Sequence, residues 1–331
     1  MNALKTAIIG CGPRAYGHAD AARRGQALTL VCACDIDTAR ADKAAAAWGV
    51  RTVHDAAEVF ADREVEAVII VTNVGTHIPL AKAALAAGKQ VIVEKPLGDD
   101  IAAARDLVAL AARSPQTVYV SYQLRFMPQM AAIHAAARDI APVQVLFGRS
   151  RGMMKPQFLN PTPFCGIMDV CAHDFDMVSW FMGAAPVAVS AVLRRNTFTR
   201  DTGAADALSA VIDYGDGRSA TIVSTIGAPE IGTKCDIAGA KGNISWGRDG
   251  KLSGMRFAEF QSEGVKTPLD LTCESGVNPD AALQKAFLAE VRSGVRSDAA
   301  RPQDGLNSLL LTLACLKSAE EGRRVRLKEV Q

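Results

Sequence analysis

The sequence has none of the features that place a chain in a membrane, outside the cell or on nucleic acid. It contains no apolar run of 18 residues and no N-terminal targeting segment, so we expect a cytoplasmic protein without a membrane partner. Its 37 basic residues nearly balance its 35 acidic ones, and no basic block is longer than an Arg-Arg pair. A net charge of +2 is too weak to hold a phosphate backbone, so nucleic acid is not an expected partner.

The cysteines lack the spacing of a metal or redox site. None of the eight belongs to a Cys-x-x-Cys pair, and Cys32 and Cys34 share one face of a strand-like run. We therefore expect buried free thiols and no bound metal ion. The eight positions are residues 11, 32, 34, 165, 171, 235, 273 and 315.

The length and composition favour two globular domains. A chain of 331 residues is about twice the ~150 residues of a typical domain. A content of 49% hydrophobic and 22% charged residues is typical of a globular protein and excludes a disordered chain. There is neither an internal repeat nor a low-complexity linker between the two expected parts.

The first part of the chain alternates short apolar strands with alanine-rich helical stretches. This alternation predicts a parallel sheet with right-handed crossovers, which is a doubly wound Rossmann domain over residues 1–121. The expected strands are residues 6–9, 28–34, 67–71, 90–93 and 117–120, and the expected helices include 41–48, 79–87 and 101–112.

The rhythm changes after about residue 122, where longer β-rich segments are joined by hairpin signals. The turn at 214–217 separates two such segments, 207–213 and 218–226. We expect a second α+β domain over residues 122–331, with an open, mostly antiparallel sheet that binds substrate and supports oligomerisation. Its expected helices are residues 166–182, 281–292 and 303–319.

A dinucleotide-binding fingerprint follows the first strand. Gly10 allows a tight turn, Gly12 lets a pyrophosphate approach the backbone, and Ala15 lets helix and strand pack closely. Asp35 lies 20 residues beyond Ala15, at the end of the second strand, where a carboxylate can bind the ribose diol. Asp35 and Asp37 would repel a 2'-phosphate, which favours NAD over NADP, although Arg40 could compensate.

A lysine stands at another strand end, in the run Glu94-Lys95-Pro96. Ligands of open α/β sheets bind at the carboxyl ends of strands, and the proline restricts the backbone of Lys95, with a cis bond possible between them. Such an ammonium can donate a hydrogen bond to a reacting oxygen and favour the developing alkoxide. The alternative interpretation is a solvated surface lysine.

Three titratable residues share one face of the helix expected at 166–182. Asp169, His173 and Asp176 have the spacing i, i+4, i+7 in an otherwise apolar segment. Asp169 can orient the His173 imidazole, which can take a proton near neutral pH. The alternative is a capping carboxylate beside a core histidine, and metal binding is disfavoured because no third ligand is clustered there.

Together these motifs, with Thr72-Asn73, His77 and Arg125-Phe126-Met127-Pro128, resemble the glucose-fructose oxidoreductase/inositol dehydrogenase family over essentially the whole chain. The resemblance implies a Rossmann domain followed by an open-faced α/β domain. It also implies that Lys95, Asp169 and His173 are catalytic. With the fingerprint, it gives the expected NAD contacts: Gly10, Gly12, Pro13, Arg14, Asp35, Ile36, Thr72, Asn73, His77, Glu94, Lys95 and Gln123.

The chain departs from this family near the expected substrate site. Members commonly have a glycine-rich run before the catalytic helix and a Thr-Pro-Asn motif, whereas this chain has Phe164-Cys165-Gly166 and Thr72-Asn73. The segment 226–235 has no tyrosine, so myo-inositol itself is poorly supported as the substrate. The polar residues expected around substrate, if they are not ordinary loop residues, are Arg125, Lys155, Asn160 and Thr162.

These residues predict an NAD-dependent oxidoreductase that acts on a secondary hydroxyl of a sugar, glycoside or cyclitol. Two alternatives remain open. One is a redox-assisted glycosidase, which oxidises its substrate transiently, eliminates the aglycone and does not consume NAD. The other is an NAD-binding sensor without catalysis. The expected binding partner is a small carbohydrate or polyol substrate. The protein itself is expected to form a homodimer or homotetramer.

Overall fold

The computed structural model describes residues 2–152, 154, 159, 163–195, 202–228, 232–249, 255–262, 265–268 and 277–330. It divides into two compact units. Unit 1 comprises residues 1–127 and 277–306, and unit 2 comprises residues 128–276 and 307–331. Among the described residues, no helix is both long and apolar enough to cross a bilayer.

Unit 1 is built on a six-stranded parallel sheet in the order β3-β2-β1-β4-β5-β6. This order confirms the doubly wound fold, since the chain moves outward in both directions from β1. Strand β4 and the part of β5 after Gln90 are fully buried, and both are continuous apolar runs because helices cover both faces of such a sheet. The strands are β1 (Leu4–Ile9), β2 (Leu28–Cys34), β3 (Arg51–Val53), β4 (Ala67–Ile70), β5 (Gln90–Val93) and β6 (Val118–Val120).

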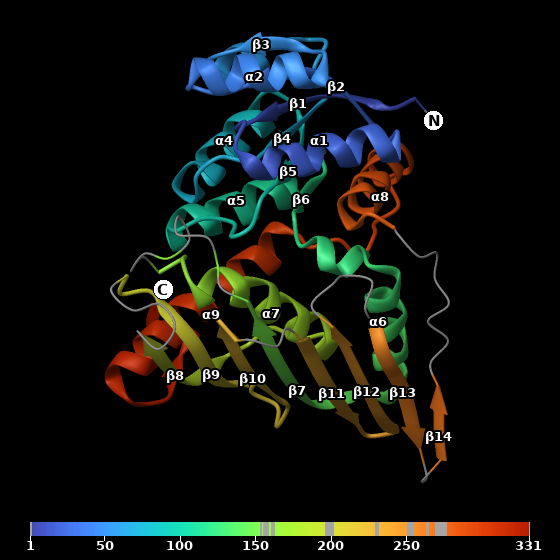
Figure 1. Cartoon of the computed structure of the whole chain (residues 1–331), viewed down its shortest axis with the longest axis vertical. Helices are drawn as coiled ribbons and strands as arrows, with labels where there is room; N and C mark the ends of the chain where they lie inside the picture. The colour runs from blue at the N-terminus through green and yellow to red at the C-terminus, as the bar shows by residue number, and fades with distance from the viewer. Residues whose placement is uncertain are drawn as a thin grey trace. The chain divides into compact units, whose positions relative to one another are not determined.

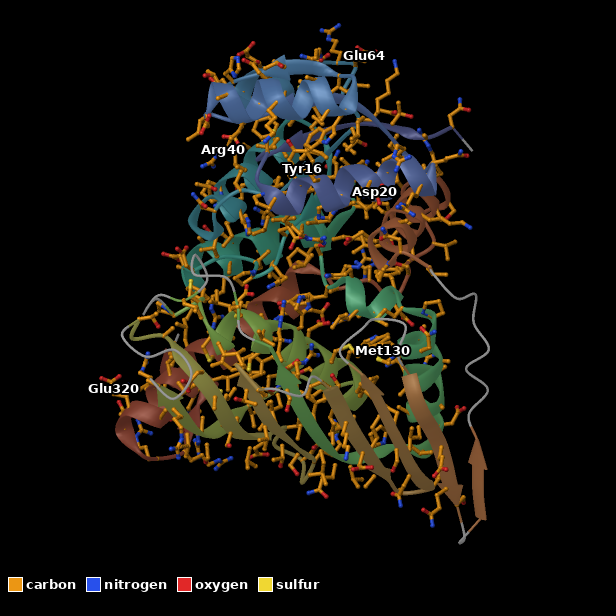
Figure 2. The ribbon with its side chains drawn as sticks, viewed as in Figure 1. Tyr16, Asp20, Arg40, Glu64, Met130 and Glu320 are labelled. Carbon is orange, nitrogen blue, oxygen red and sulfur yellow. The ribbon has the colours of Figure 1, made fainter. Side chains whose placement is uncertain are left out.

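Local capping signals set most helix boundaries in unit 1. The carboxylates of Asp37, Asp55 and Asp100 accept backbone N–H groups at the starts of α2, α3 and α5. Tyr16 of α1 extends toward α2 (Figure 2), where its ring packs edge to face on Trp48 with centroids 5.4 Å apart. The helices are α1 (Pro13–Gly25), α2 (Thr38–Trp48), α3 (Ala56–Ala61), α4 (Val74–Ala86) and α5 (Ile101–Arg113).

The expected start of the helix at Pro79 is wrong. Helix α4 begins five residues earlier, at Val74, so Pro79 lies inside it. Because Pro79 has no N–H, the Gly75 carbonyl lacks its usual helical hydrogen bond. Both residues are exposed, so solvent can supply this bond.

Residues 277–306, late in the chain, belong to unit 1. The domain division expected from the sequence, with one boundary after residue 121, assigns them to the second domain. Helix α8 (Pro279–Ser293) lies beside α1 (Figure 1), and its apolar face joins the core formed by α1 and the sheet. Leu283, Phe287 and Leu288 pack in one cluster with the small residues Ala15 and Ala19. The short helix η1 (Gln123–Phe126) also belongs to unit 1 and contacts α8.

Unit 2 contains a nine-stranded sheet in the order β14-β13-β12-β11-β7-β10-β9-β8-β15. All described pairs are antiparallel except β7 with β10, so the sheet is mixed but mostly antiparallel. The predicted hairpin joins β9 to β10. The strands are β7 (Pro142–Arg151), β8 (Ala188–Arg195), β9 (Ala205–Asp213), β10 (Ser219–Ile226), β11 (Gly232–Gly239), β12 (Gly242–Asp249), β13 (Met255–Ser262), β14 (Val265–Pro268) and β15 (Val325–Arg326).

Helix α7 covers one face of this sheet (Figure 1). Side chains alternate along β9 and β10, so that Leu208, Ala210 and Ile222 are buried while Val211 and Val223 are exposed. The opposite face therefore carries apolar residues in solvent. The helices of this part of the chain are α6 (Pro128–Ile140), α7 (Ile167–Met182), α9 (Pro302–Glu321) and η3 (Leu327–Val330).

Candidate functional site

The loop between β1 and α1 has the geometry of a phosphate cradle. Gly10 has φ +94°, and a Cβ there would lie 2.5 Å from the Val71 carbonyl oxygen, so only glycine fits. A Cβ at Gly12 would meet no atom within 4 Å. Helix α1 begins with Pro13 and has neither a side-chain cap nor an acidic residue in its first turn. The open space at a positively polarised helix end fits the pyrophosphate of a dinucleotide.

Asp35 holds this loop in place. Its Oδ2 accepts the Cys11 N–H at 2.8 Å, and its Oδ1 accepts the Asp37 N–H at 2.9 Å. Arg40 is already engaged, with its Nε 3.2 Å from Asp37 Oδ2. Ile36 is 92% exposed between the two carboxylates, an unusual position for a large apolar side chain unless a ligand covers it.

The cysteines around the loop are inert thiols. Burial raises the pKa of Cys11 and Cys34 to about 12, so neither is a thiolate at neutral pH. Every described cysteine is free, and only Cys165 is partly exposed, while Cys273 lies outside the described residues. No group of three potential metal-ligating side chains occurs in the part of the chain that the structure describes.

His77 joins two loops at the carboxyl end of the sheet. Its Nδ1 lies 2.8 Å from the Pro96 oxygen, and its Nε2 lies 3.1 Å from the Thr72 oxygen. Burial lowers the pKa of His77, so the ring is neutral at pH 7 and donates to one carbonyl at a time. Both contacts of the His77 ring are therefore with backbone carbonyl oxygens. Thr72 and Asn73 lie at the start of α4, and the Asn73 side chain does not cap this helix.

Glu94 and Lys95 follow β5 directly, as predicted, and the Lys95–Pro96 bond is cis. The Glu94 carboxylate is buried, with Oε1 accepting from Arg14 Nε at 2.7 Å and lying 2.8 Å from His18 Nε2. Its Oε2 accepts the Lys95 backbone N–H at 3.1 Å. Burial alone would raise the pKa of Glu94, but Arg14 and His18 outweigh it and hold this pKa well below its usual range.

The Arg14 side chain is committed to two carboxylates. Besides Glu94, it binds Asp280 of α8 in a bidentate pair with distances of 2.8 and 2.6 Å. The expected cofactor contact at Arg14 can come from its backbone at the start of α1 or from the second N–H group of Nη1 or Nη2.

Arg125 and Gln123 lie in η1. The Arg125 guanidinium is buried, with Nη2 3.2 Å from Asp304 Oδ1. The sequence predicts Arg125 as a substrate contact, but it does not predict this buried ion pair with Asp304. The other three expected substrate residues, Lys155, Asn160 and Thr162, lie outside the described residues.

Asp169 and His173 lie one turn apart on α7 in unit 2, as predicted. Both are partly exposed on a helix whose other residues are nearly all buried. Asp176, which the spacing places on the same face, is buried instead. Gly166 sets the start of the helix, since a Cβ at its φ of +61° would lie 2.4 Å from the Ala205 oxygen.

The sequence reasoning missed His18, Asp280 and Asp174. His18 could have been found from its i+4 spacing to Arg14, whereas nothing local connects Asp280 to a residue 266 positions away. Asp174 is fully buried beside His173, with Oδ1 2.7 Å from Arg149 Nε and Oδ2 accepting from Ser224 Oγ. It anchors α7 to β7 and β10.

The two units match the two parts of one family. Residues 4–122 match the oxidoreductase family with an NAD-binding Rossmann fold, and residues 139–245 match the GFO/IDH/MocA C-terminal domain. An inositol 2-dehydrogenase of Rhizobium meliloti (strain 1021) is 27% identical over 333 residues, covering 98% of this chain and 99% of the relative. A D-apiose dehydrogenase of Paraburkholderia graminis is 25% identical, covering 99% and 91%.

Solved structures share the fold over the whole chain. An oxidoreductase from Agrobacterium radiobacter, in complex with NAD+, L-tartaric acid and magnesium, has a TM-score of 0.83 at 22% identity and covers 99% of each chain. At that identity the likeness establishes the fold alone.

We expect the Glu94 ion cluster to make stability depend on pH. Because the pKa of Glu94 is depressed by folding, its carboxylate stabilises the fold above the ordinary value of about 4.3, and this stabilisation is lost as the pH falls through the folded value. Glu94→Gln should lower the free energy of unfolding by about 3 kcal/mol at pH 7. Urea unfolding at pH 7, 5, 4 and 3 should show the two proteins converging in acid, whereas a constant difference would contradict this account.

Proposed function

Because the chain belongs to the GFO/IDH/MocA oxidoreductase family, with an NAD-binding Rossmann fold, we propose that it is an NAD-dependent sugar or cyclitol dehydrogenase. The proposal rests above all on the full-length similarity to an inositol 2-dehydrogenase, supported by a second relative that is a D-apiose dehydrogenase. A secondary hydroxyl of a cyclitol, sugar or glycoside is the group that we propose is oxidised.

The proposed roles follow from what each side chain can do. His173 takes the proton of the substrate hydroxyl, and Asp169, one turn away on α7, orients the imidazole and stabilises its cation. Lys95 donates a hydrogen bond to the same oxygen and favours the developing alkoxide. When bound, NAD supplies the redox chemistry by accepting the hydride. In the reverse direction His173 returns the proton to a keto sugar.

The proposed cofactor contacts centre on the cradle and on Asp35. The backbone at Gly10, Gly12 and Pro13 would hold the pyrophosphate, and Asp35 would accept hydrogen bonds from a ribose diol. Arg40 shares its charge with Asp37, so it offers little compensation for a 2'-phosphate. This favours NAD over NADP.

The catalytic roles predict selective losses of turnover. Lys95→Ala and His173→Asn should each lower kcat by about 100-fold or more, because each removes a group that acts on the reacting oxygen. NAD affinity of His173→Asn should stay within about twofold of the parent, since His173 is not among the expected NAD contacts. Absorbance at 340 nm with aldoses, uronates, cyclitols and aryl glycosides measures turnover, and aglycone release is followed in parallel.

His54→Asn is the matched control, because His54 is an exposed histidine after β3. It should leave kcat unchanged. Aglycone release without net NADH would replace the dehydrogenase by a redox-assisted glycosidase. Tight NAD binding with no turnover of any substrate would indicate a sensor, and unchanged turnover in His173→Asn would remove this residue from the proton-transfer role.

Cofactor choice should depend on the charge of Asp35. Asp35→Asn keeps an acceptor for the Cys11 N–H but removes the negative charge, so the ratio of NAD to NADP affinity should fall by about tenfold. Fluorescence titration with both reduced nucleotides measures this ratio. Asp42→Asn, an exposed carboxylate on α2, is the control, and an unaltered ratio in Asp35→Asn would assign nucleotide choice elsewhere.

The open face of the nine-stranded sheet supports a homodimer or homotetramer. Leu146, Val223, Val211 and Val192 are 45–70% exposed on the neighbouring strands β7, β10, β9 and β8, respectively. Exposed apolar residues on four adjacent strands of one sheet face are typical of an interface. Val223→Lys should shift the mass measured by light scattering to the monomer, because it places a charge in the middle of this face. Val295→Lys, at an exposed valine beyond α8, should not, and a wild type that is already monomeric would refute the proposal.

A further inference from the structure

We propose that Asp280, Arg14 and His18 are positioning residues that act on Lys95 through the carboxylate of Glu94. The inference rests on the proposed function, which gives Lys95 its role at the reacting oxygen. It concerns a chain of contacts that begins on α8, crosses α1 and ends at the backbone of Lys95.

The last link in this chain is the hydrogen bond from the Lys95 backbone to Glu94. Glu94 Oε2 accepts the Lys95 N–H at 3.1 Å, immediately beyond the end of β5. Pro96 has no N–H of its own, so of these two residues only Lys95 offers a backbone donor to the Glu94 carboxylate. The orientation of the Glu94 carboxylate therefore affects the position of the Lys95 backbone, from which the Lys95 side chain extends.

The middle link is the pair of groups on the other carboxylate oxygen. Arg14 Nε lies 2.7 Å and His18 Nε2 lies 2.8 Å from Glu94 Oε1, and these two residues are one turn apart on α1. His18 is fully buried, and its Nδ1 has no hydrogen-bond partner among the described residues. Because an ionised carboxylate only accepts, the Nε2 of His18 donates, and the ring fixes one side of Glu94.

The first link is the bidentate pair between Arg14 and Asp280. Both Asp280 oxygens bind the guanidinium, at 2.8 and 2.6 Å, which leaves only Nε directed at Glu94. Asp280 is itself held in the first turn of α8, where its N–H donates to the Asn278 cap at 2.9 Å. The flexible arginine is thus held at both ends of its planar group, so its Nε reaches Glu94 in one geometry.

A second carboxylate on the same helix shows what a purely structural ion pair would look like. Glu290 of α8 is buried and accepts from Arg301 Nη2 at 2.7 Å and from Tyr119 OH at 2.8 Å. Its contacts with Tyr119, Ser297 and Arg301 lead away from Glu94, whereas Asp280 reaches the Lys95 backbone through Arg14 and Glu94. Glu290→Gln is therefore a matched control for Asp280→Asn, since both remove one buried charge from α8.

The first experiment measures steady-state kinetics of the full-length variants with NAD and the best substrate of the panel. Asp280→Asn should lower kcat by about 10- to 100-fold with KM for substrate within about threefold, because a displaced lysine weakens the transition state more than binding. Glu290→Gln should lower the unfolding midpoint but leave kcat unchanged. In a Lys95→Ala background, Asp280→Asn should have little further effect, because its target is already gone.

The second measurement needs no turnover. Residue-resolved hydrogen exchange of the Lys95 amide reports the bond to Glu94 directly, and Asp280→Asn and His18→Asn should each speed it about tenfold or more relative to amides in the middle of β5. Glu290→Gln should leave that ratio unchanged.

The two proposals fail in distinguishable ways. Aglycone release without net NADH would overturn the proposed function, and normal kcat in Lys95→Ala would overturn the role of Lys95 in it. In either case the amide exchange would still decide whether Asp280 holds the Lys95 backbone. The expected loss in Lys95→Ala, with an additive further loss from Asp280→Asn in the double variant, would overturn the positioning role. So would equal losses of kcat in Asp280→Asn and Glu290→Gln, or an unchanged exchange rate of the Lys95 amide.

Discussion

The buried carboxylate of Glu94 is the constraint on which unit 1 depends. An ionised carboxylate inside a protein is costly unless cations and N–H donors surround it, and Glu94 obtains them from Arg14, His18 and the Lys95 backbone. Arg14 in turn needs Asp280, which lies on a helix from the far end of the chain. The return of residues 277–306 to unit 1 is therefore part of the same electrostatic arrangement, together with the apolar packing of α8 on α1.

Unit 2 contains a comparable arrangement beside the other proposed catalytic residue. Asp174, next to His173, is buried and balanced by Arg149 of β7 and Ser224 of β10. In both units a satisfied carboxylate adjoins the residue proposed to do chemistry and ties it to the sheet. Preorganisation of this kind lets a flexible lysine or an imidazole act without first paying the entropy of being ordered.

The nucleotide loop follows the same principle on a smaller scale. Gly10 is required by its backbone angle and by the nearness of Val71, while Asp35 ties the loop to the end of β2 through the Cys11 N–H. Asp35, which is expected to bind the ribose, therefore also holds the backbone of the cradle in place. A change at Asp35 consequently affects both nucleotide choice and the loop.

The sequence by itself determined the features that have a local signature. Strand and helix periodicity gave the parallel sheet and the β9–β10 hairpin, and the spacing of Gly10, Gly12 and Asp35 gave the cradle, because each depends on residues close together in the chain. Only the tertiary structure decided the partners of Glu94, the burial of Asp176 and the place of α8 in unit 1. Arg14 and Asp280 are 266 residues apart, and no local pattern records a contact that exists only once distant helices have packed.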